Sequence, residues 1–202
     1  MTIDTKNVLS SILESISRID YIKPEHIPNI DLYMDQVTTF MEEELEQTKR
    51  YPEDKILTKT MINNYAKNNL LPPPVKKKYS REHILALIFI YYFKNLLSIK
   101  DIETLLDPIT GGYFGGSGGF SMTEIYEEVC ALEKSRIDSM AKDIARIYKS
   151  SLDTFSNAPE EDRKMLQNFS FICSLAFDVY VKKQVIEKLI DDMPEPESKK
   201  KK

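Results

Sequence analysis

The distribution of glycine divides this chain of 202 residues into two parts. All six glycines lie between Gly111 and Gly119, and a cluster of this kind is typical of a linker. A phosphate-binding loop is strongly disfavoured, because no strand precedes the cluster and no Gly-Lys-Ser/Thr follows it. The sequence therefore predicts a Gly-rich linker over residues 109–120, with an N-terminal head before it and a helical region after it.

The region after the glycines has the apolar periodicity of two long helices. Ser121 and Glu124 have capping-box spacing, and a break at 156–159 separates the first helix from a final helix at about 160–191. The apolar positions of the first helix recur at intervals that average near 3.6 residues. They are Met122, Ile125, Val129, Leu132, Ile137, Met140, Ile144 and Ile147.

The final helix is apolar nearly all round between Phe169 and Val181. A single partner helix covers only one face, so either this helix also packs on the head or a second subunit covers it. We predict a helical dimerisation hairpin over 121–191. The tail at 192–202, with two prolines and four terminal lysines, is expected to be disordered.

Charge is distributed unevenly along the chain. Residues 55–100 contain nine Lys or Arg residues against one acid, Glu82, which gives this segment a net charge of +8. The whole protein has a net charge of −4, so the remainder carries −12. A basic segment inside an acidic protein indicates a partner that is a polyanion, and nucleic acid is the first to consider.

The first part of the head reads as two helices joined by a long loop. After a flexible lead at 1–23, Asp31 can cap a helix, and a charged loop follows at 46–57. Thr58 or Thr60 then caps a short helix that runs to about Asn68. The apolar positions of the two helices are Leu32, Met34, Val37, Phe40, Met41 and Leu45, then Met61, Ile62 and Tyr65.

The second part of the head begins where Asn69 can take the left-handed conformation that often ends a helix. Three prolines at 72–74 hold the next residues extended, and the lysines at 76–78 project from that strip. Ser80 caps a buried helix, and Ser98 caps a short one that ends at Leu106. The inner face of the buried helix is predicted to be Ile84, Leu87, Ile88, Tyr91 and Leu96. These elements form a compact four-helix head over 24–108.

From Thr58 to Leu106 the sequence resembles the DNA-binding head of the MerR family of bacterial transcription regulators. The matching residues are Tyr65–Pro74, Tyr79-Ser80, His83-Ile84, Leu87, Phe89-Ile90, Lys94, Leu96, Ser98, Ile102 and Leu105-Leu106. The resemblance implies a winged helix-turn-helix whose recognition helix lies in the first stretch. More narrowly, the chain resembles a bacterial family with a domain of unknown function, DUF1836, which shares the block at 28–37.

The chain departs from the MerR pattern at several positions. Asn63 and Asn64 stand where those recognition helices have Arg and Tyr, and Asn69 replaces a glycine. Only 75–78 separate the prolines from Tyr79, so the wing is either a short hairpin or a basic loop. A long loop also replaces the tight turn between the first two helices.

The predicted DNA-binding residues combine two kinds of contact. Asn63 and Asn64 either read adenine edges in the major groove or belong to a solvated helix face. The basic residues contact phosphates, and Tyr65 contacts either a phosphate or the core. The predicted set is Lys59, Thr60, Asn63, Asn64, Tyr65, Lys67, Lys76, Lys77, Lys78, Tyr79 and Arg81.

The sequence gives little support to other classes of function. Cys130 and Cys173 stand apart in apolar sequence, which is typical of reduced core thiols in a cytoplasmic protein. With only two histidines besides, no set of residues has metal-ligand spacing, and we expect no cofactor. The longest apolar run, 84–93, is about half a membrane span. The sequence has no nucleophile and base at the spacing of a catalytic motif, so nothing in it indicates an enzyme.

These observations predict a mostly α protein that binds double-stranded DNA and regulates transcription as a homodimer. A small-molecule or protein effector is left open. The alternative is a protein interaction module without a DNA role, in which the acidic face at 42–46 and the apolar last helix bind another protein.

Overall fold

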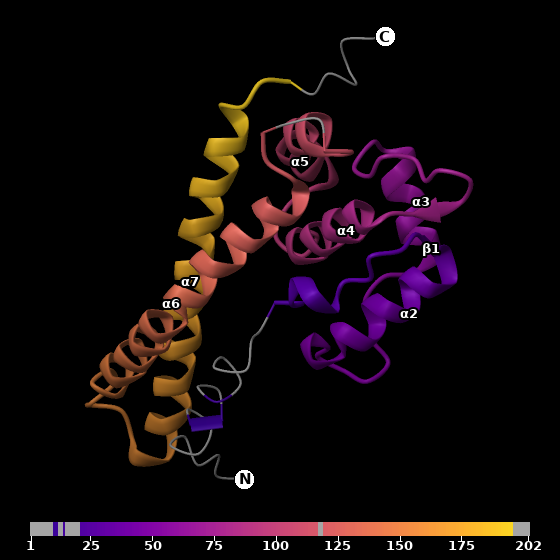
Figure 1. The fold of residues 1–202 in the computed structure, drawn as a ribbon. Coiled ribbons are helices and arrows are strands. Elements are labelled where there is room, and N and C mark those ends of the chain that lie inside the picture. The colour runs from indigo at the N-terminus through magenta and orange to yellow at the C-terminus, as the bar shows by residue number, and fades with distance from the viewer. Residues whose placement is uncertain (1–9, 12–13, 15–20, 117–118, 196–202) are drawn as a thin grey trace. The chain divides into compact units, whose positions relative to one another are not determined.

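The computed structural model is mostly helical and contains a small antiparallel sheet (Figure 1). It describes residues 10–11, 14, 21–116 and 119–195, so the predicted lead and tail lie largely outside the described residues. Within the described segments, no helix is long and apolar enough to cross a membrane. The chain divides into two compact units, a head unit of 22–129 with 187–202, and a hairpin unit of 1–21 with 130–186.

The head begins with a 3-10 turn, Pro24–His26, the strand β1, Leu32–Tyr33, and the helix α2, Met34–Glu44. The predicted cap at Asp31 is wrong, because Leu32 pairs with Tyr79 of a second strand and the backbone stays extended. Tyr33 precedes the helix instead, and its amide donates to Gln36 Oε1 at 2.8 Å. The buried positions of this segment are Leu32, Val37, Met41 and Leu45, all in the predicted stripe.

The helix α3, Lys59–Lys67, begins and ends through contacts a few residues apart. Thr58 is the N-cap, since its Oγ1 accepts a hydrogen bond from the amide of Met61 at 3.2 Å. Asn69 follows the helix with φ +58°, the left-handed conformation predicted for it. Ile62 and Tyr65 are buried, also as predicted.

Beyond the prolines, a minimal hairpin leads into the helix α4, Arg81–Phe93. Its second strand, β2, is Lys78–Tyr79 and pairs with β1. Every residue from His83 to Tyr91 is buried, so α4 is the central helix of the head, whereas Leu96, predicted to be buried, is exposed.

The helix α5, Ile99–Tyr113, is longer than the sequence predicts. The predicted capping box is present, with the amide of Ser98 donating to Asp101 and the amide of Asp101 donating to Ser98 Oγ. The helix does not stop at Leu106, and Gly111 and Gly112 lie inside it. The first residues of the predicted linker are therefore helical.

The helix α6, Met122–Leu152, begins where the sequence predicts, but its first turns belong to the head. Its capping box is confirmed, because the amide of Ser121 donates to Glu124 Oε2 at 2.7 Å. Met122 and Tyr126 are fully buried in the head, where the Tyr126 hydroxyl donates to the carbonyl of Ile22 at 2.7 Å. The head thus includes the first two turns of α6 and ends near 129, rather than at 108.

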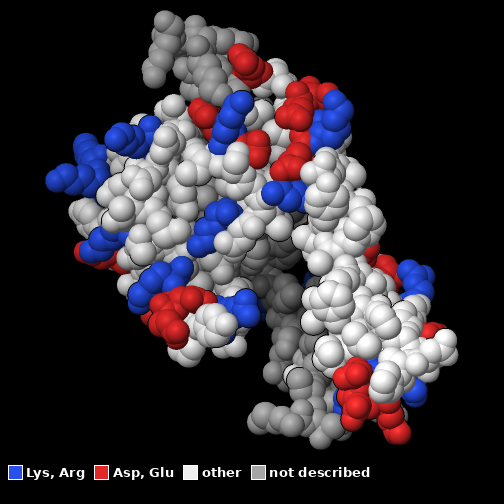
Figure 2. Space-filling model, turned by 180° about the vertical axis from the view of Figure 1, so that it is seen from behind, with Lys and Arg blue, Asp and Glu red and all other residues white. Residues whose placement is uncertain are grey.

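The hairpin unit consists of the rest of α6 and most of α7, Glu160–Asp191. Tyr148 of α6 and Phe171 of α7 meet edge to face with centroids 5.3 Å apart. The predicted stripe of α6 is partly wrong, because Val129, Leu132 and Met140 are exposed. Over the hairpin, at the right of Figure 2, a broad part of the visible surface carries no charged side chain.

Candidate nucleic-acid interface

The outer face of α3 carries five of the eleven side chains that the sequence predicts to contact DNA. Residues three and four apart share one face of a helix, and the predicted positions on α3 follow that spacing. All of them except Tyr65 are exposed, namely Lys59, Thr60, Asn63, Asn64 and Lys67. Their exposure makes this face accessible to a partner.

The first lysine of this face is held by an acid of the same unit. Lys59 forms an ion pair with Asp35, which lies in the first turn of α2. Both side chains are more than half exposed, so the pair contributes little to stability. A phosphate can replace Asp35 as the partner of this lysine at small cost.

A two-residue turn carries the next two lysines at the tip of the hairpin. The amide of Val75 donates to the Lys78 carbonyl at 3.1 Å, and the amide of Lys78 donates back at 2.9 Å. Lys76 and Lys77 have φ of +51° and +64°, the pattern of a type I′ turn, which favours Asn and Gly. Each lysine costs about 1 kcal/mol in this conformation. The alternative of an irregular basic loop is wrong, because the lysines form a true hairpin.

The third lysine, Lys78, lies in β2 after the turn and is half-buried. Lys78 Nζ lies 5.3 Å from the centre of the Tyr33 ring, a cation–π contact with the neighbouring strand. The ammonium groups of Lys67, Lys76 and Lys77 make no ion pair with any residue that the structure describes. Lys76 and Lys77 at the tip of the turn and Lys67 at the end of α3 are therefore the least neutralised cations of this region.

Two predicted contacts, Tyr65 and Tyr79, belong to the core instead. They are 7% and 3% exposed, and burial raises the pKa of both phenols above the ordinary value. For Tyr65 this selects the core contact that the sequence left open beside phosphate. For Tyr79 it corrects the prediction, since pairing with Leu32 turns the ring inward.

Arg81 is also engaged inside the head rather than directed outward. Its guanidinium donates to the carbonyl of Ile27 at 2.5 Å, to that of Pro24 at 2.6 Å and, more weakly, to Thr123 Oγ1 at 3.4 Å. These contacts join α4 to the first turn of the head and to α6. The structure thus gives Arg81 a structural role, which its position in a basic segment did not indicate.

His83 fixes the junction between the hairpin and α4. Its Nδ1 accepts from the amide of Ser80 at 3.0 Å, and its ring meets Tyr79 and Phe114 edge to face. The side chain is 2% exposed, and burial lowers the pKa of the imidazole, while the carbonyls of Pro73 and Pro72 act more weakly in the opposite direction. His83 is therefore a neutral structural group.

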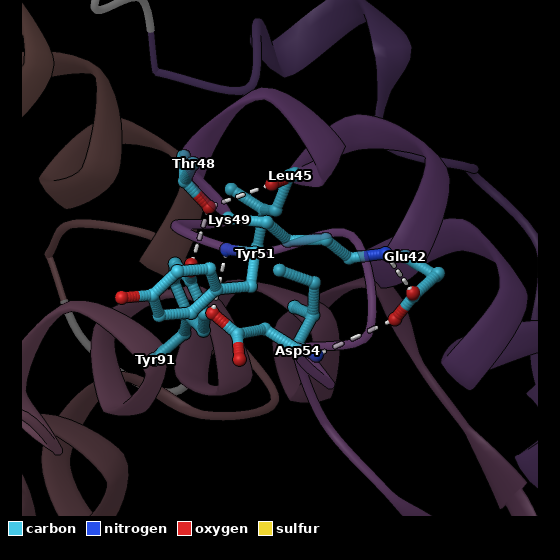
Figure 3. Close-up of polar contacts among 8 residues, drawn as sticks. Glu42, Leu45, Thr48, Lys49, Tyr51, Asp54 and Tyr91 are labelled. Atoms are coloured by element: carbon cyan, nitrogen blue, oxygen red, sulfur yellow. Dashed lines mark hydrogen bonds and ion pairs between the residues drawn. The ribbon is translucent and has the colours of Figure 1, made fainter.

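The loop before α3 is fastened to α2 and α4 (Figure 3). Glu42 pairs with Lys49 and accepts from the amide of Ile56 at 3.4 Å, and the bond to Lys49 lowers the pKa of the Glu42 carboxyl. Thr48 bonds to the hydroxyl of Tyr91. This loop, long where the MerR pattern has a tight turn, is thereby held in place.

Lys94 is a positioning residue that sequence reasoning missed. Its Nζ donates to the carbonyl of Ile56 at 2.6 Å and lies 4.8 Å from the centre of the Tyr91 ring. Desolvation lowers the pKa of this ammonium group. Its position after an apolar helix was the available signal, but the sequence pattern placed it only in the basic segment and among the residues that resemble the MerR head. Of the nine cations at 55–100, Arg81 and Lys94 therefore serve the head itself.

The structure offers no sign of a metal centre in the part of the chain that it describes, where no three His, Cys, Asp or Glu side chains converge.

Among known proteins, no curated protein and no solved structure matches this chain. A family model described as a domain of unknown function, DUF1836, matches residues 22–129. The matched segment has the same limits as the continuous part of the head unit. Since it covers more than half of the sequence, the chain belongs to the DUF1836 family.

Proposed function

We propose that this protein is a sequence-specific DNA-binding transcription regulator of the MerR-like type that acts as a homodimer. One observation carries the proposal: the exposed polar face of α3 and the lysine-tipped hairpin belong to the same head, and both α3 and β2 contact α2. Lysines at these two places can contact phosphates on both sides of a helix inserted into DNA.

The dimensions of α3 suit a recognition helix. Nine residues make a helix about 13 Å long. This length is close to the width of the major groove, which is about 12 Å. Asn63 and Asn64 lie in the middle of the exposed face, and an amide can form two hydrogen bonds with the edge of adenine. Lys59 and Lys67 lie at the two ends, where the groove meets phosphates.

The hairpin supports the same assignment. In a winged helix-turn-helix, a β-hairpin follows the recognition helix, as β2 follows α3 here. The short hairpin at 75–79 lies at the position where the resemblance of 58–106 to the MerR head implies a wing. The fastened loop at 46–57 takes the place of the tight turn.

Lysine substitution in the hairpin tests DNA binding directly. In the triple variant Lys76→Ala, Lys77→Ala, Lys78→Ala, the affinity for DNA should fall on every sequence. The salt slope, which is the slope of log affinity against log salt concentration, should fall in magnitude by about one unit for each phosphate that is no longer bound. Fluorescence anisotropy on duplex DNA at several salt concentrations measures both. The matched control is Lys142→Ala, Lys149→Ala, Lys164→Ala in the hairpin unit, which removes the same charge. No binding at low salt, or equal slopes for both triple variants, contradicts the proposal.

Base reading by the asparagines needs a preferred site, which selection from random duplex DNA with the purified protein supplies. On that site, Asn63→Ala or Asn64→Ala should cost about 1–3 kcal/mol, with little change on random DNA. Thr60→Ala, on the same face, tests whether the effect is particular to the amides. Equal losses on both DNAs would show that another element reads the sequence.

A second candidate is a protein interaction module without a DNA role. The exposed apolar surface of α7 favours protein association, whereas the acidic face at 42–46 does not, because Glu42 pairs with Lys49 and Glu44 contacts His26 within the head. Salt-dependent retention on DNA separates the two functions.

A further inference from the structure

The apolar surface of α7 has a pattern that a second copy of the same helix fits. Met165, Phe169, Ile172, Ala176 and Val179 follow one another at intervals of four, three, four and three residues. This spacing places them in one stripe along the helix and is the heptad spacing of helices that pair. All five residues are exposed, and the four large ones are between 54% and 62% exposed, so α6 does not cover this stripe.

The stripe is nearly symmetric about Ile172 when the helix is reversed. Met165 and Val179 each lie seven residues from Ile172. Phe169 lies three residues before it and Ala176 four residues after it, so a reversed copy sets the largest side chain of the stripe against the smallest. Pairing of large with small residues allows two helices to pack closely without overlap or void.

Charge at the ends of the stripe has the same reversed symmetry. Glu161 and Asp162 precede it, and Lys182 and Lys183 follow it. Asp162 and Lys182 each lie ten residues from Ile172, and Glu161 and Lys183 each lie eleven. An antiparallel copy therefore brings the acids of one helix beside the lysines of the other, at both ends of the pair. A parallel copy would instead set acids beside acids and lysines beside lysines.

We propose that two copies of the protein pair through α7, antiparallel and with a two-fold axis at Ile172. The arrangement is isologous, so each contact occurs twice and the pair closes without exposing a further site. It names the surface of the homodimer in the proposed function and rests on that homodimer, but not on DNA binding. Each of its tests is made without DNA, so failure of the pairing and failure of DNA recognition are measured separately.

Cysteine crosslinking distinguishes the two orientations. In full-length protein with Cys130→Ser and Cys173→Ser, Ile172→Cys should form a disulfide-linked dimer on oxidation, because the two thiols meet at the axis. Met165→Cys alone and Val179→Cys alone should stay uncrosslinked, while a mixture of the two proteins should crosslink. Efficient crosslinking of Met165→Cys by itself would overturn the antiparallel arrangement.

Solution mass measures the pairing itself. Light scattering at micromolar concentration should give a dimer for the natural sequence, and Ile172→Glu should raise the dimer dissociation constant by about 100-fold or more, since two carboxylates meet at the axis. Val181→Glu is the control, because Val181 is exposed on another face of α7. Circular dichroism checks that both variants keep their helix content. A monomeric natural protein would overturn the proposal, and would indicate that another part of the chain covers the stripe.

Charge reversal tests the register. Glu161→Lys with Asp162→Lys should weaken the dimer by roughly tenfold, because like charges then face each other at both ends. Adding Lys182→Glu and Lys183→Glu to the same protein should restore the constant to within about threefold. A four-residue variant weaker than the two-residue one would place the acids and lysines apart and overturn this register.

Discussion

The head unit buries most of its large apolar side chains, whereas the helical hairpin unit leaves many of them exposed. In α4 of the head, nine consecutive residues are buried, and the surface around them carries the lysines and asparagines of α3 and the lysines of the turn at 75–78. In α7 of the hairpin, Phe169, Ile172 and Phe177 are each at least 60% exposed. A central helix needs neighbours on all sides, and the head supplies them, whereas two helices cover only one face of each other.

The difference indicates what each region can do alone. The head closes its own core, and the exposed face of α3 is polar, which suits reversible binding of a charged partner such as DNA. The hairpin leaves apolar surface in water, which monomeric soluble proteins rarely do over a large area. The antiparallel α7 pair that we propose would cover this apolar surface.

Removal of matching leucine side chains measures the comparison most directly. Leu87→Ala in α4 should lower the free energy of unfolding of the head by about 3 kcal/mol, because it leaves a cavity around a fully buried position. Leu132→Ala in α6, at a position 60% exposed, should change stability by less than about 0.5 kcal/mol. Denaturant titration followed by circular dichroism gives both values. Equal costs would mean that Leu132 is covered in solution.

Arg81 should affect the stability of the head but not its DNA binding. Arg81→Met removes hydrogen bonds to two carbonyls and should cost about 2 kcal/mol of unfolding free energy. The salt slope of DNA binding should stay at the natural value, because this guanidinium faces the head. Lys67→Met is the control that should lower the slope at little cost in stability. A lower slope for Arg81→Met would return this residue to the interface.

Substitutions in the lysine turn at 75–78 should change the stability of the head and its affinity for DNA in opposite directions. Lys76→Asn with Lys77→Gly suits the left-handed conformations and should stabilise the head by about 1–2 kcal/mol. DNA affinity should fall, since two cations are removed. Lys76→Ala with Lys77→Ala removes the same charges without relieving the strain, so its affinity should fall equally and its stability should not rise. Unchanged affinity in both proteins would show that the lysine turn does not contact DNA.

His83 should give the head, unlike the hairpin, a stability that depends on pH near neutrality. Its pKa is lowered by burial in the folded state, so below about pH 6.5 the unfolded chain takes up a proton that the folded head excludes. The unfolding free energy of the head should therefore be constant above that pH and fall as the pH is lowered below it. His83→Gln, which can still accept from the amide of Ser80, should remove this fall.

Local contacts explain what could be read from the sequence of the head and its site. Thr58, Ser98 and Ser121 cap helices through residues only three positions away, so the pattern that predicts them is contained in a few letters. The exposure of Asn63 and Asn64 follows from the helical period and the buried positions of Ile62 and Tyr65 in the same way. The family, too, is visible in the order of such motifs.

Several of the corrections involve partners distant in sequence. Tyr33 ends up in a strand because β2 lies beside it, and Arg81 turns inward because the carbonyls of Pro24 and Ile27 come within its reach. Lys94 is drawn to Ile56, and the head extends to 129 because Tyr126 reaches Ile22 and Phe89.

The sequence by itself thus determined that the protein is mostly helical, the caps at Thr58, Ser98 and Ser121, the basic segment and the apolar excess of α7, since each depends on residues within one or two turns. The tertiary structure alone decided which cations face outward, where the head ends and how the lysine turn is shaped. A charge or a ring has the same local pattern whether it binds the protein's own backbone or a partner, and only the folded chain brings the distant acceptor to it.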